Sequence, residues 1–176
     1  MARSLSLLQC LVLLAAVSLT GTSTTVTVTA VVGKCSLGTG AMAFGSYDPI
    51  VANATTPFDS ALNGITGSIT ISCTKGTASP TPAVQLSLGS NAAHASGSCK
   101  TGTCTRAMSD GAGDYLSYDL YTSAAENTVW NTSNTVAYSS TSFAPATLTI
   151  YGYIPAAQNV SISANYSDSI LATVNY

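Results

Sequence analysis

The feature that most restricts the fold of this chain is a residue-by-residue alternation of apolar and polar side chains. It first appears in residues 24–32, where threonines occupy one face and apolar residues the other, the apolar set being Val26, Val28, Ala30 and Val32. A repeat of two residues is typical of a half-buried β-strand, whereas an amphipathic helix repeats every ~3.6 residues. Beyond Cys35 no segment is long enough and regular enough for a helix. The pattern predicts an all-β chain.

Five further runs show β-type alternation, and Gly, Pro, Asn and Ser residues separate them. The residues expected to face inward are Ile65, Gly67, Ile69, Ile71 and Cys73; Val84, Leu86 and Leu88; Leu116, Tyr118 and Leu120; Leu148, Ile150, Gly152 and Ile154; and Tyr166, Asp168, Ile170, Ala172, Val174 and Tyr176. Several short strands separated by turn residues predict a sandwich of antiparallel sheets. Residues 89–105 and 123–145 are expected to form long loops.

The strand predicted at residues 24–32 has no obvious hairpin partner beside it. The turn-like pair Gly33-Lys34 leads into another loop-like run at residues 36–40 rather than into a pairing strand. This strand must therefore pair with a segment far away in the sequence, or with another molecule.

The first residues have the character of a secretory signal peptide. Arg3 precedes an apolar run from Leu5 to Leu19, and small and polar residues follow. The run is too short and too interrupted for a membrane span. We expect residues 1–21 to be removed on export, with the exact cleavage position left open.

Cleavage would also remove Cys10 and leave an even number of cysteines: Cys35, Cys73, Cys99 and Cys104. In an exported chain this predicts two disulfides, for which the sequence alone permits three pairings. The spacing favours a local bond from Cys99 to Cys104 around a turn-like tetrapeptide, leaving Cys35 for Cys73. The paired CxxC spacing of a zinc site is absent, so no metal site is expected.

Composition restricts the classes of partner. Only 7% of the residues are charged, the formal net charge is −2, and the five Lys and Arg residues form no cluster. A surface that is polar but largely uncharged argues against nucleic acid or an anionic membrane as a ligand.

The residues that usually carry catalysis are sparse. The single histidine, His94, lies in a loop-like run, and the seven acidic residues are scattered without a paired motif. Residues 110–114 only faintly resemble a calcium loop and are better explained as a polar turn. We therefore expect neither an enzyme nor a cofactor.

Two other features, one polar and one aromatic, have structural interpretations. Asp168 falls on the apolar face of the last predicted strand, so it should lie at an exposed start or anchor a loop through hydrogen bonds. Trp130 and the nine tyrosines could form a sugar-binding platform, but in a β-sandwich such residues more often fill the core and edges.

The chain resembles the spore coat protein U domain, which is shared by the pilins of archaic chaperone-usher pili. The matching pieces cover nearly all of the chain after the leader; they are Cys35, Phe44-Gly45-Ser46-Tyr47-Asp48-Pro49, Gly67 to Thr74, Arg106-Ala107-Met108, Leu116 to Tyr121, Val129-Trp130, Tyr151 to Pro155, Tyr166-Ser167-Asp168 and Thr173 to Tyr176.

This resemblance implies an immunoglobulin-like antiparallel β-sandwich that lacks its final strand and is completed by a donor strand. Residues 22–33 would be the donor-strand extension and residues 34–176 the incomplete domain. The donor side chains would be Val26, Val28, Ala30 and Val32. The acceptor groove would be bordered by a final strand carrying Ile170, Ala172, Val174 and Tyr176.

The resemblance also implies partners and a location. Subunits would form a homopolymer by donor-strand exchange, with help from a periplasmic chaperone and an outer-membrane usher, and the fibre would serve adhesion or biofilm formation at the cell surface. A spore or cyst coat protein is the alternative setting for the same fold. A carbohydrate-binding adhesin that uses Trp130 and the tyrosines is the alternative of another class.

Overall fold

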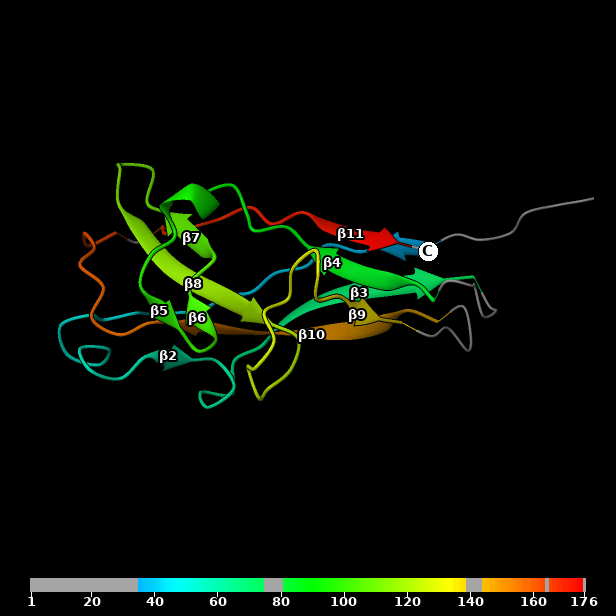
Figure 1. Cartoon of the computed structure of the whole chain (residues 1–176), viewed down its shortest axis with the longest axis horizontal. Coiled ribbons are helices and arrows are strands. Elements are labelled where there is room, and N and C mark those ends of the chain that lie inside the picture. The colour runs from blue at the N-terminus through cyan, green and yellow to red at the C-terminus, as the bar shows by residue number, and fades with distance from the viewer. Residues whose placement is uncertain (1–34, 75–80, 139–143, 164, 176) are drawn as a thin grey trace, which may run out of the picture. The chain divides into compact units, whose positions relative to one another are not determined.

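The computed structural model describes residues 35–74, 81–138, 144–163 and 165–175, which belong to one compact unit (Figure 1). The predicted signal peptide, the predicted donor strand and Tyr176 lie outside the described residues.

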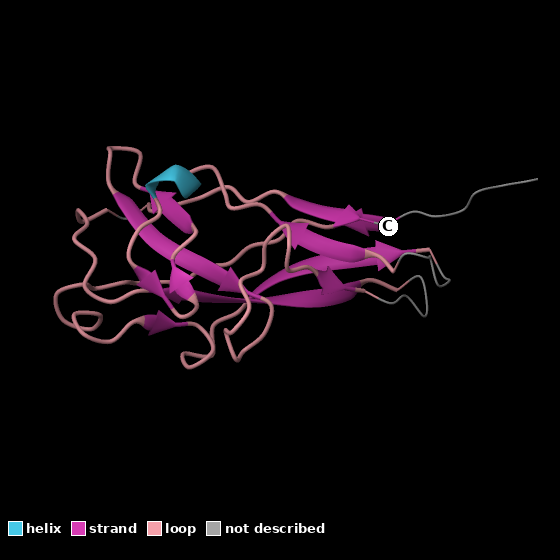
Figure 2. Ribbon diagram, in the orientation of Figure 1, coloured by secondary structure: helices cyan, strands magenta, loops and turns pink. Residues whose placement is uncertain are grey.

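Strands form nearly all of the regular structure that is described, together with a single turn of 3-10 helix, η1 (Ala92–His94) (Figure 2). The strands are β1 (Cys35–Leu37), β2 (Phe58–Asp59), β3 (Gly67–Cys73), β4 (Ala83–Leu86), β5 (Ser98–Cys99), β6 (Gly102–Thr103), β7 (Arg106–Ser109), β8 (Tyr115–Tyr121), β9 (Val136–Ala137), β10 (Ala146–Ile154) and β11 (Ala172–Asn175). The prediction of an all-β chain is confirmed.

The larger sheet has the strand order β1-β3-β10-β8-β7, and all of its pairings are antiparallel. β10 is the longest strand and connects its two halves. The first part of β10 pairs with β3, placing Leu148 opposite Ile69, and its second part pairs with β8, placing Gly152 opposite Leu120. β2 adds a short pairing at the end of β10.

The smaller sheet has the order β11-β4-β9 and is also antiparallel. Val84 of β4 lies between Val174 of β11 and Val136 of β9. Figure 1 shows this sheet over the end of the larger sheet that contains β3 and the first part of β10. The predicted immunoglobulin-like sandwich of antiparallel sheets is the observed fold.

Apolar residues from both sheets form one core between the layers. Its buried residues are Phe44, Phe58, Ile69, Ile71, Cys73, Val84, Leu86, Leu116, Tyr118, Leu120, Trp130, Ile150 and Ile154. Burying apolar surface is the main favourable contribution to folding, so the inward rows of alternating residues determine how each strand faces. Most of the residues predicted to face inward belong to this core or are partly buried against it.

Three details differ from the sequence-based expectations. Leu88 is 40% exposed because β4 ends at Leu86. β8 is buried on both faces, since Ser96 donates to Ser117 and Thr105 donates to Asp119 across its second face. The last strand is only four residues long, because its regular pairing with β4 covers Ala172 to Asn175.

The regions expected to be long loops also contain short regular elements. Residues 89–105 include η1 and the β5–β6 hairpin, and residues 123–145 include β9. Two-residue strands alternate too briefly to be recognised in a sequence, and β9 in addition depends on pairing with the distant β4.

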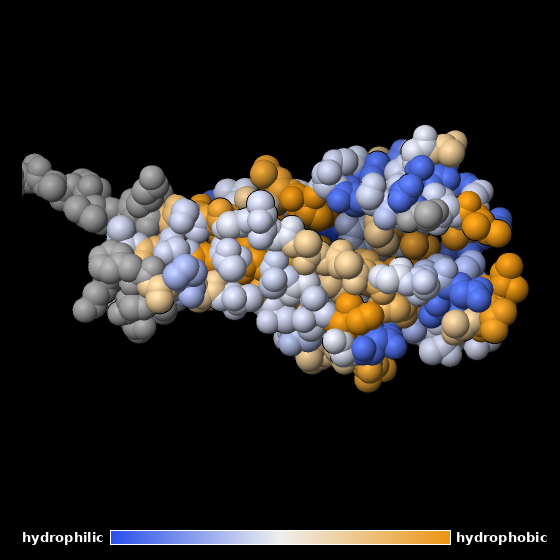
Figure 3. All heavy atoms as spheres, turned by 180° about the vertical axis from the view of Figure 1, so that it is seen from behind, coloured by the Kyte–Doolittle hydropathy of each residue, from blue (hydrophilic) through white to orange (hydrophobic). Residues whose placement is uncertain are grey.

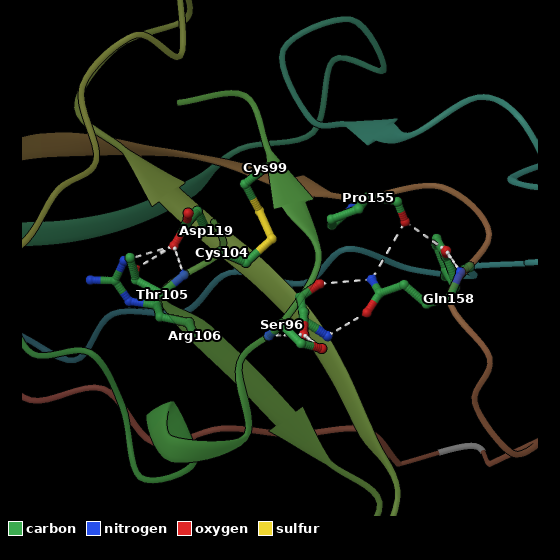
Figure 4. The surroundings of a disulfide bond; sticks show 10 residues. Ser96, Cys99, Cys104, Thr105, Arg106, Asp119, Pro155 and Gln158 are labelled. Atoms are coloured by element: carbon green, nitrogen blue, oxygen red, sulfur yellow. Dashed lines mark hydrogen bonds and ion pairs between the residues drawn. A yellow bond between two sulfur atoms is a disulfide. The ribbon is translucent and has the colours of Figure 1, made fainter. Parts of the chain in front are cut away.

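Both predicted disulfides are present. Cys35 is bonded to Cys73, where β1 pairs with β3, and Cys99 is bonded to Cys104 next to the β5–β6 hairpin (Figure 4). The first bond joins residues 38 positions apart and the second joins residues five positions apart.

Candidate functional site

An apolar groove lies at the edge of the sandwich, with a volume of about 360 Å³. One group of lining residues comes from the segment 38–44 that follows β1, and another from residues 166–172, which lead into β11. Core side chains of both sheets complete the lining: Ile69, Leu86, Met108, Tyr118, Leu120 and Ile150. The groove therefore opens into the hydrophobic core.

The strand β11 lies beside this groove and, among the described residues, has a free edge. It pairs with β4 on one side, and no strand in the described part of the chain pairs with its other side. Ser87 donates its N–H to the carbonyl of Leu171 at 2.8 Å, so the backbone of Leu171 faces β4. Because successive residues of an antiparallel strand alternate in direction, the backbone groups of Ile170, Ala172 and Val174 face the free edge.

Side chains on this strand alternate in the same way. Leu171 is 69% exposed, whereas Ile170, Ala172 and Val174 are partly buried and pack against the core. Ile170 and Ala172 also line the groove. Of the four residues predicted for the final strand, Ile170 and Ala172 line the groove, Val174 packs against the core, and Tyr176 lies outside the described residues.

Asp168 holds the chain at one end of the groove. Its Oδ1 accepts hydrogen bonds from the Ser90 N–H (2.9 Å) and from Asn91 Nδ2 (3.2 Å), and its Oδ2 accepts one from the Tyr118 hydroxyl (2.9 Å). Burial, together with the nearby Asp168 carboxylate, raises the pKa of Tyr118 far above its ordinary value. Asp168 is thus the loop anchor that its position in the sequence predicted.

Two glycines allow the segment 38–44 to approach the larger sheet closely. A Cβ atom on Gly67 would lie 2.6 Å from the Ala41 carbonyl oxygen, and one on Gly152 would lie 2.5 Å from Phe44 Cζ. The Phe44 ring contacts Phe58 and Tyr118 edge to face, with both centroid distances at 5.8 Å. The shape of this wall of the groove therefore depends on Gly67 in β3 and Gly152 in β10, because a larger side chain at either position would collide with the segment 38–44.

A second buried polar cluster surrounds the Arg106 side chain. Arg106 Nη2 donates to the carbonyl oxygens of Ser87 (2.8 Å) and Trp130 (2.5 Å), and Nη1 lies 3.8 Å from Asp119 Oδ1. Trp130 is fully buried and donates from Nε1 to the Val84 carbonyl at 2.9 Å. Burial lowers the pKa of Arg106 and raises that of Asp119. Trp130 is a core residue and has no exposed face on which a sugar could stack.

The remaining candidates from the sequence are structural. His94 is exposed and stacks on the Tyr115 ring at 3.7 Å. Asp110 Oδ1 accepts the backbone N–H groups of Ala112, Gly113 and Asp114, which lowers the Asp110 pKa and accounts for the polar turn.

One group of potential metal ligands occurs among the described residues, namely Cys99, Cys104 and Asp119. Its two sulfur atoms are bonded to each other, so they do not offer thiolate ligands (Figure 4). No helix in the described ranges combines the length and apolar composition that a membrane crossing requires.

Sequence reasoning missed a cluster formed by Asp59, Lys100 and Glu126. Lys100 Nζ lies 2.6 Å from Asp59 Oδ2 and 2.8 Å from Glu126 Oε2. The three residues are scattered along the chain, and no spacing rule connects them. Only the fold, which brings β2, the β5–β6 turn and the 123–128 turn together, reveals this site.

The fold and the groove define a class of protein: a disulfide-bonded immunoglobulin-like sandwich with an apolar groove beside β11, a strand that no second described strand pairs. Comparison with known proteins identifies the family. Residues 20–173 match the Spore Coat Protein U domain. The chain is also 34% identical over 149 residues to Protein U of Myxococcus xanthus, an alignment that covers 82% of this chain and 78% of that protein.

The chain belongs to the Spore Coat Protein U domain family, whose domain is that of the archaic chaperone-usher pilins. This family consists of structural pilus and coat proteins rather than enzymes, and its members are extracellular. The chain is accordingly a structural protein of the pilus or coat type.

Proposed function

We propose that this protein is the repeating subunit of a cell-surface pilus assembled by donor-strand exchange. Residues 22–33 of one subunit would enter the groove of the next, with Val26, Val28, Ala30 and Val32 facing its core. The observation that carries the proposal is the apolar groove next to the free edge of β11. A strand placed there would complete both the core and the smaller sheet.

The sequence of the extension suits this role physically. Eight residues in a strand span about 26 Å, and each buried valine contributes roughly 1.5–3 kcal/mol. Backbone hydrogen bonds along the edge of β11 would add to the apolar contacts, because the backbone of Ile170, Ala172 and Val174 faces that edge. A strand held along its full length dissociates slowly, so the resulting fibre would be durable.

The same groove explains why assembly would need other proteins. An unpaired strand edge beside exposed apolar surface promotes aggregation. A periplasmic chaperone that covers the groove, and an outer-membrane usher that exchanges the chaperone for the next subunit, would protect the chain during export. The proposed location is the cell surface, where the fibre serves adhesion or biofilm formation.

Two complementary variants test the proposal. A chain without residues 22–32 retains the groove but has no donor, and Ala172→Arg retains the donor but obstructs the groove. We expect the wild type to form a ladder of SDS-resistant oligomers on gels of unboiled samples. Each variant alone should give no ladder, and the two mixed should give heterodimers and nothing longer.

Leu171→Arg and Thr27→Arg are the matched controls, because Leu171 is 69% exposed and Thr27 lies on the polar face of the extension. Both controls should retain the ladder. A ladder formed by the chain without residues 22–32 would contradict the proposal.

A coat protein of a spore or cyst is the second candidate, and the family to which the chain belongs favours it. Immunogold labelling of whole cells and of resting cells distinguishes the two settings. Label along surface fibres of growing cells supports the pilus, whereas label confined to the coat of resting cells supports the alternative. A sugar-binding role has no support at Trp130, whose side chain is buried.

A further inference from the structure

The cluster of Asp59, Lys100 and Glu126, termed here the Lys100 cluster, combines an amine with two carboxyl groups. Both carboxyl groups contact the same nitrogen, at 2.6 Å for Asp59 Oδ2 and 2.8 Å for Glu126 Oε2. The Asp59 side chain is 6% exposed and that of Glu126 is fully buried, whereas the Lys100 side chain is 37% exposed. The cluster is therefore closed on the carboxyl side and open to solvent on the lysine side.

The two carboxyl groups have different surroundings. Asp59 Oδ1 accepts the backbone N–H of Leu62 at 3.0 Å. Glu126 Oε1 is buried, and no hydrogen-bond donor among the described residues reaches it. Glu126 also has a positive φ of 48°, which is uncommon for a residue with a side chain. A buried, half-unsatisfied carboxyl group in an unfavourable backbone conformation is costly, which indicates a role beyond a surface ion pair.

We propose that the Lys100 cluster is a site of spontaneous covalent modification, at which Lys100 and Asp59 form an intramolecular amide bond with Glu126 as the proton carrier. Glu126 takes a proton from the Lys100 ammonium group, and the neutral amine attacks the Asp59 carboxyl carbon. A C–N bond forms, a C–O bond breaks, and the departing oxygen leaves as water after receiving protons from the nitrogen by way of Glu126. An ammonium and a carboxylate are thereby converted into one neutral amide and one water molecule, with no oxidant or other reactant.

The geometry favours this chemistry in three ways. The amine and the carboxyl group are already in contact, so the reaction needs no bimolecular encounter. For well-oriented groups this advantage corresponds to an effective molarity of about 10⁵–10⁸ M. The Leu62 N–H would stabilise the negative charge that develops on Asp59 Oδ1 during the attack. The exposed side of Lys100 gives the expelled water a route to solvent.

The electrostatics assign the roles of the two acids. Burial raises the pKa of Glu126, so this group can hold and return a proton. Lys100 lowers the pKa of Asp59, and both acids raise the pKa of Lys100. Because the amine must lose its proton before it attacks, we expect the bond to form slowly after folding.

The bond would connect parts of the molecule that are distant in sequence. Asp59 ends β2, next to the end of β10, where it lies opposite Tyr153. Lys100 lies in the turn of the β5–β6 hairpin, and its Nζ is 5.8 Å from the Tyr153 ring centroid. The amide would tie this hairpin to the larger sheet at a point that neither disulfide reaches.

Mass spectrometry of the full-length secreted chain tests the proposal. After reduction of the disulfides, the wild type should be lighter than its calculated mass by one water molecule, at once or after prolonged incubation. Lys100→Arg, Asp59→Ala and Glu126→Gln should each have the full calculated mass. The control Lys75→Arg should retain the loss of water.

Trypsin locates the bond, because the chain has cleavage sites after Lys34, Lys75, Lys100 and Arg106. With the amide present, cleavage after Lys100 fails and peptide 76–106 stays attached to peptide 35–75 after reduction. Without it, peptides 35–75, 76–100 and 101–106 separate.

Each remaining outcome would overturn the proposal. A wild-type chain that keeps its full mass throughout the incubation has no amide. A loss of water without a branched peptide would indicate cyclisation elsewhere, and a branch to the peptide that contains Glu126 would reverse the assigned roles. Near-UV circular dichroism should show that Glu126→Gln folds. A folded Glu126→Gln that still forms the amide would contradict the role given to Glu126. None of these measurements depends on whether the protein forms a pilus.

Discussion

Trp130 connects the two sheets through both its ring and its backbone. The ring is fully buried, its Nε1 donates to Val84 of the smaller sheet, and its N–H donates to Leu120 of the larger sheet. A large aromatic residue in this position contributes apolar burial and satisfies polar groups of both layers at once.

Trp130→Ala should therefore lower the free energy of unfolding by about 3–5 kcal/mol, the usual cost of removing a buried aromatic side chain. Urea unfolding of the disulfide-intact chain measures this change. Leu171→Ala, which truncates a 69% exposed side chain, should change the stability by less than about 0.5 kcal/mol. Equal losses in the two variants would contradict the role given to Trp130.

Arg106 is a second fully buried residue, and its guanidinium group bonds polar groups of the core. Arg106→Met should destabilise the fold by about 3–5 kcal/mol, because Asp119 and two carbonyl oxygens would be left buried without their cation. Adding Asp119→Leu should recover part of the loss, since the double variant no longer buries an unpaired charge. A double variant that is less stable than Arg106→Met in urea unfolding would contradict this explanation.

At the scale of elements, the groove is formed by two segments that extend beyond regular strands. The segment 38–44 continues β1 along β3, where Gly38 donates to the Thr70 carbonyl and Ala41 exchanges hydrogen bonds with Ser68. Residues 166–171 lead into β11 and are held by Asp168 and by the paired backbone of Ser109 and Ser167. Among the described residues each segment is held mainly on one side, and the space between them is where the proposed donor strand would lie.

Gly67→Ala should disturb the first of these segments. The added methyl group would meet the Ala41 carbonyl oxygen at 2.6 Å and Met42 Cβ at 2.9 Å, so the segment must move away from β3. We expect a destabilisation of about 1–3 kcal/mol and a weaker SDS-resistant ladder. Ser68→Ala, at the adjacent exposed position of β3, is the control and should leave the ladder unchanged. Unaltered assembly of Gly67→Ala would show that the segment is not a wall of the binding groove.

At the scale of the whole molecule, the two disulfides close loops of very different length. In the chain-entropy model a loop of 38 residues corresponds to about 4 kcal/mol and one of five residues to about 2 kcal/mol. Cys35→Ser/Cys73→Ser should therefore lose roughly twice as much stability as Cys99→Ser/Cys104→Ser. Thermal or urea unfolding of the two double variants measures the ratio, and a larger loss for the short loop would contradict the entropic explanation.

The fold class and most of the core were predictable from the sequence. Alternation places Ile69, Ile71, Val84 and Leu86 inside, because only one face of each strand can bury apolar side chains. The two disulfides followed from the even count of cysteines and from the tight spacing of Cys99 and Cys104. The alternation also identified Asp168 as an anomaly, since a lone carboxylate on an apolar face needs hydrogen-bond donors.

The ends of the strands were less predictable, because partners outside the strand determine them. Leu88 continues the alternation of β4 but is exposed, since the strand itself ends at Leu86. Residues 117, 119 and 121 alternate as an outer face and yet are buried, because the segment 96–105 covers β8.

Only the tertiary structure brought together residues that the sequence keeps apart. Hydrophobic alternation is a local property and is visible in a few residues, whereas the groove combines residues 38–44 with residues 166–172. The Lys100 cluster likewise joins three charged residues that no local pattern relates. The sequence by itself therefore determined most of the apolar side chains that face the core, because alternation is local, whereas the packing of distant segments decided which residues form the groove and the Lys100 cluster.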